Sequence, residues 1–137
     1  MELDVRGPSL PEAFTRIGLM LFAAVVDPVA VRDVEVREVR AHGGGLPALL
    51  RQWLEECLYV HEVEGFACRS IDFAVFEATP RAGGEPVRLH ALLRGEPLDP
   101  ERHQARVAVR GISREGVVVE PDGGGWRARA RLQIDVV

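Results

Sequence analysis

The sequence predicts an α+β fold in which two helices pack on one face of a mostly antiparallel β-sheet. Apolar residues recur at helical spacing in 10–25 and 46–58, whereas from residue 65 onward they alternate with a period of two. The elements follow in the order strand, helix, strand, helix and then a run of strands, which is typical of α+β domains. A chain of 137 residues is expected to form one domain spanning 1–137.

The first helix begins with a capping motif. Ser9 and Glu12 form an S-x-x-E pattern with Pro11 in the first turn, where a missing backbone N–H costs nothing. The apolar stripe that follows has steps of three and four and consists of Leu10, Phe14, Ile17, Leu21, Ala24 and Val25. Asp27-Pro28 is expected to end this helix.

A strand is expected at 31–41, where valines alternate at 34 and 36 and then slip to 39. We interpret the slip as a β-bulge. Three glycines at 43–45 separate this strand from a second helix. Its apolar stripe consists of Leu46, Leu49, Leu50, Trp53, Leu54, Cys57 and Leu58.

The second half of the chain has the alternation of strands with one buried face. This pattern covers 71–75, 87–93, 107–109 and 126–136. The turns Ala82-Gly83-Gly84 and Asp122-Gly123-Gly124-Gly125 predict antiparallel hairpins. Residues 95–103 contain two prolines and are expected to form a longer loop.

Composition excludes several classes of protein. The chain is 47% hydrophobic and 28% charged, which is typical of globular proteins and not of disordered or coiled-coil chains. No apolar run approaches the roughly 20 residues of a membrane span, and the first residues do not resemble a secretory signal, so we expect a cytoplasmic protein. A net charge of −4 argues against a broad surface for nucleic acid. All 17 basic residues are arginine, which we interpret as the mark of a GC-rich genome.

The sequence contains few residues in patterns that carry chemistry. Cys57 and Cys68 lack metal-ligand spacing and are expected to be buried thiols. Motifs for a nucleophile, a phosphate loop or a zinc protease are missing from the sequence. His61, Glu62 and Glu64 have ligand chemistry, but a charged helix end explains them as well. The histidines are expected at the surface: His42, His61, His90 and His103.

The last strand offers two further candidate sites. Strict alternation places Arg127, Arg129 and Arg131 on one face, which is either a solvated outer surface or a contact for RNA phosphates. Asp135 lies beside the C-terminal residues, where a carboxylate and main-chain oxygens can converge. Such oxygen donors suit Ca²⁺ or Mg²⁺.

Several runs taken together resemble the archease family. Each run alone has little specificity, but their order and spacing cover nearly the whole chain. The runs are SLPEAF at 9–14, WLEECLY at 53–59, EG at 64–65, GEPLDPERH at 95–103, VRGI at 109–112, and Trp126 with the final Ile134-Asp135-Val136.

The resemblance implies an archease-like α+β fold and a protein that is not itself an enzyme. Archeases promote guanylylation of the GTP-dependent tRNA-splicing RNA ligase, and tRNA is thus an indirect partner. A chaperone-like role with a tRNA methyltransferase is also proposed for the family. We therefore expect an activator or chaperone of an RNA ligase. The alternative is an RNA-binding or general chaperone module for tRNA-modifying enzymes, which would use the arginine-lined strand face.

The family resemblance also implies a divalent metal, Ca²⁺ in family structures. Two aspartates hold it, one that closes an N-terminal D-H-T-A-D motif and one beside the C-terminus. The second corresponds to Asp135, with Val136 adding a main-chain oxygen. The N-terminal aspartate of the family aligns immediately before Met1. Either this half of the metal site is lost, or the reading frame begins upstream of Met1. We favour the upstream start, because the resemblance begins abruptly and in register at residue 2. Glu2 and Asp4 are nearby substitutes, and we expect a weak metal site.

The run that the family writes V-K-A-I-T-Y-H is VRGISRE at 109–115. Arg110 keeps the charge of the family's functional lysine, and the resemblance implies contact with a phosphate or an acidic group of the partner. Asp99 and His103 are assigned to the same partner contact, where they would shape the adjacent loop. Arg114 and Glu115 replace tyrosine and histidine, which predicts an altered contact geometry.

Overall fold

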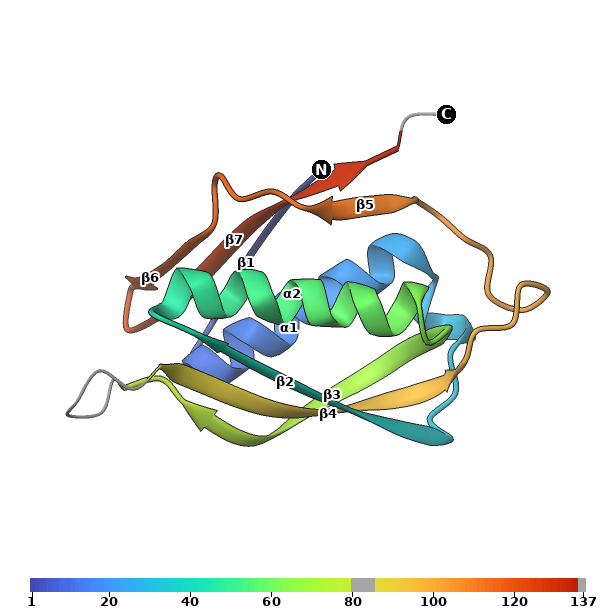
Figure 1. Ribbon diagram of the computed structural model, residues 1–137, viewed down its shortest axis with the longest axis horizontal. Coiled ribbons are helices and arrows are strands. Elements are labelled where there is room, and N and C mark those ends of the chain that lie inside the picture. Colours follow the sequence, from blue (N-terminus) through green and yellow to red (C-terminus); the bar gives the residue numbers. More distant parts are fainter. Residues whose placement is uncertain (80–85, 136–137) are drawn as a thin grey trace.

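Two antiparallel sheets enclose a layer of two helices in the computed structural model, which describes residues 1–79 and 86–135 (Figure 1). The elements in chain order are β1 (Glu2–Gly7), α1 (Leu10–Val25), a 3₁₀ helix (Pro28–Ala30), β2 (Glu35–Gly43), α2 (Leu46–Glu62), β3 (Phe66–Glu77), β4 (Val87–Pro97), β5 (Val109–Ile112), β6 (Val118–Asp122) and β7 (Gly125–Ile134).

The sheet topology confirms the α+β class and the antiparallel pairing, but the strands form two sheets and not one. In the first sheet β7 pairs with β1 on one side and with β6 and β5 on the other. In the second sheet β4 lies between β2 and β3. Both helices contact strands of both sheets, because their buried residues cover a wide arc. A helix with so broad an apolar surface needs cover on two sides.

The two helices form where the apolar periodicity predicts them. The Ser9 hydroxyl accepts a hydrogen bond from the Glu12 amide at 3.3 Å, which confirms the expected N-cap of α1. After α1 ends, the Asp27 carboxylate accepts from the Val29 amide at 3.0 Å and caps the 3₁₀ helix. Residues 31–34, which belong to no helix or strand, then lead into β2.

The expected bulge in the strand after α1 was wrong. β2 begins at Glu35, and its register with β4 runs without interruption from Glu35 opposite Gly95 to Gly43 opposite Val87. The valine slip arises because Val36 faces solvent, whereas the inward face of β2 begins only at Val39. The irregularities of this sheet lie instead in β3, between 68 and 70 and between 73 and 75.

The hairpin of β3 with β4 pairs as expected. The turn at 122–125 also joins two antiparallel strands, but the strand before it is β6 and not the strand expected at 107–109. The turn residues 82–84 lie outside the described residues. β6 was not predicted, because it is a short strand of five residues that includes a glutamate and a proline. β4 extends to Pro97, so the loop predicted at 95–103 begins later than expected.

The core is centred on Trp53, which has no exposed surface. Its indole N–H donates to the Phe14 carbonyl at 3.0 Å, and its ring lies 5.3 Å from that of Phe73. Cys57 and Cys68 are free and buried, as predicted. Burial raises the pKa of both thiols, that of Cys68 to about 12, so neither supplies a thiolate near neutral pH.

Candidate functional site

The pairing of β5 with β7 brings together two residues that the sequence places in separate motifs. The Asp135 amide donates to the Ala108 carbonyl at 3.0 Å, which holds the end of β7 against the approach to β5. Arg110 occupies a register irregularity between Val109 and Gly111. Its Nε lies 3.7 Å from Asp135 Oδ1, and the two side chains are 69% and 52% exposed. An ion pair this exposed contributes little to stability, so both groups remain accessible to a partner.

A shallow groove of about 450 Å³ is lined in part by residues of β5 and β7. Its lining comes from the start of α2, the connection after β5 and the end of β7, and comprises Arg51, Ile112, Ser113, Arg114, Glu115 and Gln133. Arg114 and Glu115, the two departures from the family motif, therefore line a groove in the connection that directly follows β5, the strand that carries Arg110. This surface displays both signs of charge within a small area.

The described residues do not fit a Ca²⁺ ion at this place. Within 1–79 and 86–135, no three side chains of histidine, cysteine, aspartate or glutamate converge on one point. Ca²⁺ takes six to eight oxygens, and the Arg110 guanidinium beside Asp135 opposes a second cation. Val136 lies outside the described residues.

The other suggested metal ligands have different partners. Asp4 and Glu2, the substitutes for the missing aspartate, bind Arg127 and Arg129. His61 Nδ1 lies 3.1 Å from the Phe66 carbonyl oxygen, at the junction between α2 and β3. The interpretation of residues 61–64 as a charged helix end therefore agrees with the structure better than a metal cluster does.

His103 was expected at the surface, and that expectation was wrong. Its side chain is buried, because the Asp99 amide donates to its Nδ1 at 2.8 Å. The Asp99 carbonyl accepts from the amides of Arg102 and His103, and its carboxylate accepts from the Glu101 amide at 3.0 Å. Asp99 and His103 thus close their own loop, and His103 does not face a partner.

Sequence reasoning missed the group around which this loop is organised, the buried carboxylate of Glu96. It accepts hydrogen bonds from the Arg32 amide and the Arg102 guanidinium and lies 3.5 Å from His103 Nε2. Arg102 also donates to the Ala30 carbonyl at 3.1 Å. The only hint in the sequence was the position of Glu96 within the GEPLDPERH run. This cluster ties the segment before β2 to the loop that leads toward β5.

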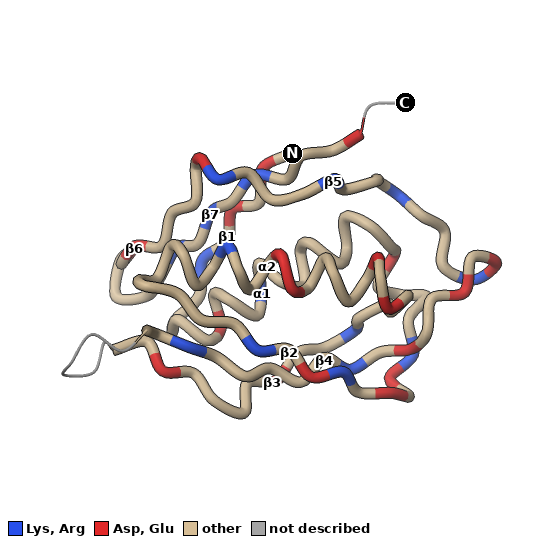
Figure 2. Tube along the Cα trace, viewed as in Figure 1, with Lys and Arg blue, Asp and Glu red and all other residues tan. Residues whose placement is uncertain are grey.

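The arginine-lined face of β7 lies where alternation predicts it, but two of its arginines are neutralised by carboxylates. Arg127 donates to both carboxylate oxygens of Asp4, at 3.0 and 2.7 Å, and Arg129 donates to Glu2 at 2.8 Å. The Arg127 guanidinium holds the pKa of Asp4 below its usual value. Figure 2 shows the two signs of charge interspersed along β1 and β7. Such a face is expected to bind RNA phosphates weakly, because the carboxylates already occupy its guanidinium groups.

Neither helix of the described chain has the length and apolar character of a membrane span.

Comparison with known proteins agrees with this fold. The Archease protein family (MTH1598/TM1083) matches residues 1–135. Protein archease of Pyrococcus abyssi is 37% identical over 125 residues, which are 90% of this chain and 84% of the relative. That of Methanopyrus kandleri is 35% identical over 108 residues, 79% of this chain and 74% of the relative.

A solved structure has the same fold. The solution structure of Methanobacterium thermoautotrophicum protein 1598 overlaps with a TM-score of 0.74 at 23% identity, covering 94% of this chain and 88% of that one. The family match extends over nearly all of the described residues and includes the β5–β7 end with Arg110 and Asp135. This chain belongs to the archease family.

Proposed function

We propose that this archease is a non-enzymatic activator of a GTP-dependent RNA ligase and that it contacts the ligase through the exposed Arg110–Asp135 pair. The observation that carries the proposal is the contact between these residues, 3.7 Å apart and more than half exposed. The sequence resemblance matches them to the family's functional lysine and to its C-terminal aspartate.

The chemistry of the pair suits a partner that is being guanylylated. Guanylylation places a negatively charged phosphoryl group on the ligase, and a guanidinium binds phosphate or carboxylate oxygens through two parallel N–H donors. Asp135 can accept from a cationic or N–H group beside that anion. The β5–β7 register holds Arg110 and Asp135 side by side, so both side chains can bind the same region of the partner.

Binding alone is sufficient for activation. If the archease binds the guanylylation-competent form of the ligase more tightly than the idle form, it raises the population of the competent form. A tenfold shift needs a difference of about 1.4 kcal/mol in binding free energy. This range is within the reach of one charge-assisted hydrogen bond. Because the described residues do not fit Ca²⁺, we assign no step of this mechanism to a metal.

The alternative functions have less support on this chain. An RNA-binding role would use Arg127 and Arg129, whose guanidinium groups are already bound by Asp4 and Glu2. A tRNA methyltransferase would be a second protein partner for the same exposed surface, and competition with the ligase would reveal it.

The test is multiple-turnover RNA ligation by the cognate ligase with GTP, with and without this protein. Arg110→Gln and Asp135→Asn are each expected to reduce the stimulation by about tenfold. The matched controls are Arg94→Gln and Asp72→Asn, because that exposed ion pair, 3.0 Å long, lies on the other sheet. Full stimulation by the Arg110 and Asp135 variants would refute the assignment of the contact.

A second arm uses a version that begins upstream with D-H-T-A-D. Stimulation by this version alone would assign the metal-binding aspartate of the family to residues before Met1. Lack of stimulation by either version would refute the activator role and favour the chaperone or RNA-binding alternative.

A further inference from the structure

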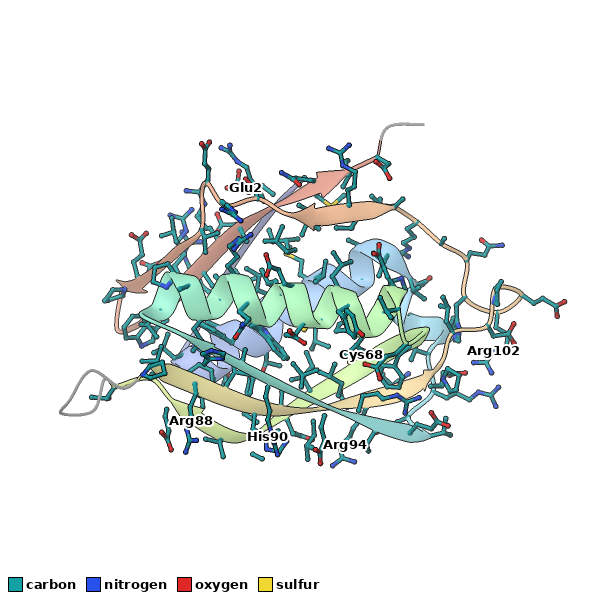
Figure 3. The ribbon with its side chains drawn as sticks, in the orientation of Figure 1. Glu2, Cys68, Arg88, His90, Arg94 and Arg102 are labelled. Atoms are coloured by element: carbon teal, nitrogen blue, oxygen red, sulfur yellow. The ribbon has the colours of Figure 1, made fainter. Side chains whose placement is uncertain are left out.

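The outer face of the second sheet carries a separate group of basic side chains. A hollow of about 580 Å³ lies there. Its lining comprises Arg40, Ala41 and His42 from β2, Arg88, Leu89 and His90 from β4, Val75 from β3, and Pro86. In Figure 3, Arg88 and His90 project from β4 on the side away from the helices. This outer-sheet hollow belongs to the sheet that lacks β5 and β7, so it lies apart from the proposed ligase contact.

Strand register groups the four basic side chains. Arg40 lies opposite His90, and His42 lies opposite Arg88. Within each strand the two basic residues are two positions apart, so their side chains share one face of the sheet. Opposed side chains begin about 5 Å apart and successive ones on a face about 7 Å apart. Four nitrogen-bearing side chains therefore surround an area that matches a single tetrahedral anion.

Arg40 and His90 have nitrogen atoms without a partner among the described residues, whereas Arg88 is held in place by a carboxylate. Glu77 binds the Arg88 guanidinium through two hydrogen bonds of 3.1 Å, which orients it beside the hollow. Arg40 is exposed and forms no ion pair with the described part of the chain. His90 Nε2 is buried without a hydrogen-bond partner among the described residues, and the Glu38 carboxylate is 3.7 Å away.

We propose that the outer-sheet hollow binds a phosphate monoester. Guanidinium and imidazole groups are the side chains that donate to phosphate oxygens, and two arginines at one site oppose a metal ion. Glu38 and Glu77 lie beside the basic group and limit its positive charge, which argues against a long track for a nucleic-acid backbone. Val75 supplies an apolar wall for the organic part of the ligand. The monoester is carried either by a mononucleotide or by the 5′ end of an RNA.

The test is calorimetric titration of the full chain with GMP, inorganic phosphate and guanosine, and with a short RNA prepared with and without a 5′-phosphate. GMP and phosphate are expected to bind and guanosine is not. Arg40→Gln is expected to weaken GMP binding by about tenfold or more, because one charge-assisted hydrogen bond is lost. His42→Gln provides a second substitution at an exposed position, and equal melting temperatures confirm that both variants fold.

Arg94→Gln is the matched control, since Arg94 lies on the same strand at the other end of the sheet, bound to Asp72. It is expected to leave GMP affinity unchanged. Binding of 5′-phosphorylated RNA alone, with the same dependence on Arg40, would support the proposal and identify an RNA end as the source. Equal affinity for GMP and guanosine, no binding of either GMP or 5′-phosphorylated RNA at millimolar concentration, equal losses in the Arg40 and Arg94 variants, or RNA binding independent of the 5′-phosphate would each overturn it.

Discussion

Replacing Glu96 by alanine tests whether the buried carboxylate organises the loop before β5. The side chain is 7% exposed and accepts from the Arg32 amide and the Arg102 guanidinium. A fully buried backbone N–H left without an acceptor costs about 1–3 kcal/mol, and the partly buried Arg32 amide is expected at the lower end of this range. Loss of one partner from a fully buried ion pair costs about 3–5 kcal/mol. Because the Arg102 side chain is 34% exposed, water can hydrate its guanidinium once the carboxylate is removed, which reduces this cost severalfold. We therefore expect Glu96→Ala to lower the free energy of unfolding by about 2–4 kcal/mol.

Urea denaturation measures this loss directly as a change in midpoint at constant slope. Glu96→Gln keeps an acceptor oxygen for the Arg32 amide and is expected to lose about half as much. Glu38→Ala serves as the control, because that carboxylate is 64% exposed and its removal is expected to change stability by no more than about 0.5 kcal/mol. If Glu96→Ala unfolds at the midpoint of the unmodified chain, the carboxylate does not organise the loop.

Four further predictions follow from the core, the first sheet and the candidate metal site. Trp53→Ala is expected to lower the free energy of unfolding by about 3–5 kcal/mol, since the side chain is fully buried, and native-like stability in urea would contradict the assigned helix face. Because Arg127 lowers the pKa of Asp4 in the folded state, the stabilising contribution of Asp4 is complete above the ordinary pKa of aspartate and is lost as the pH falls through the lowered value. Asp4→Asn is therefore expected to flatten the acid limb of a stability-against-pH curve, and an unchanged limb would contradict the pairing. Cys57 and Cys68, whose pKa values are raised by burial, are expected to react with a thiol reagent at pH 8 only as the chain unfolds, and rapid labelling of the native chain would contradict their burial. Calcium titration of the chain alone is expected to give no saturable heat below millimolar concentration, and micromolar affinity would contradict the poor fit of the described residues.

The helices and the hairpins could be predicted from the sequence because local periodicity and turn chemistry specify them. The N-cap at Ser9 and the inward-facing Trp53 follow from spacing within a few residues. The division of the strands into two sheets could not be predicted, because it depends on which strands pair across the chain. The prediction of a bulge in β2 was wrong for a related reason. The alternation of Val34 and Val36 is typical of a buried strand face, whereas both valines are exposed.

The candidate site shows the same division between local and long-range information. Arg110 and Asp135 were each identified from a motif, but their contact requires β5 to pair with β7. His103 was misplaced because a histidine in a proline-containing loop has the composition of a surface residue. Its burial depends on hydrogen bonds within the loop and on Glu96, whose role becomes visible only when β4 is extended to Pro97.

The Arg110–Asp135 pair and the outer-sheet hollow lie on different sheets, with α1 and α2 between them (Figure 1). Among residues 1–79 and 86–135 no hydrogen bond or ion pair joins the two surfaces, and the packed helices lie between them. Because α2 contacts both β2 and β5, coupling between the two surfaces would have to displace a helix whose core residue Trp53 is fully buried. Substitutions at sites without shared partners usually add. We therefore expect the double variant Arg40→Gln with Arg110→Gln to show the summed free-energy changes of the single variants in both ligation and GMP binding. A deviation well above about 0.5 kcal/mol would reveal that the two surfaces communicate.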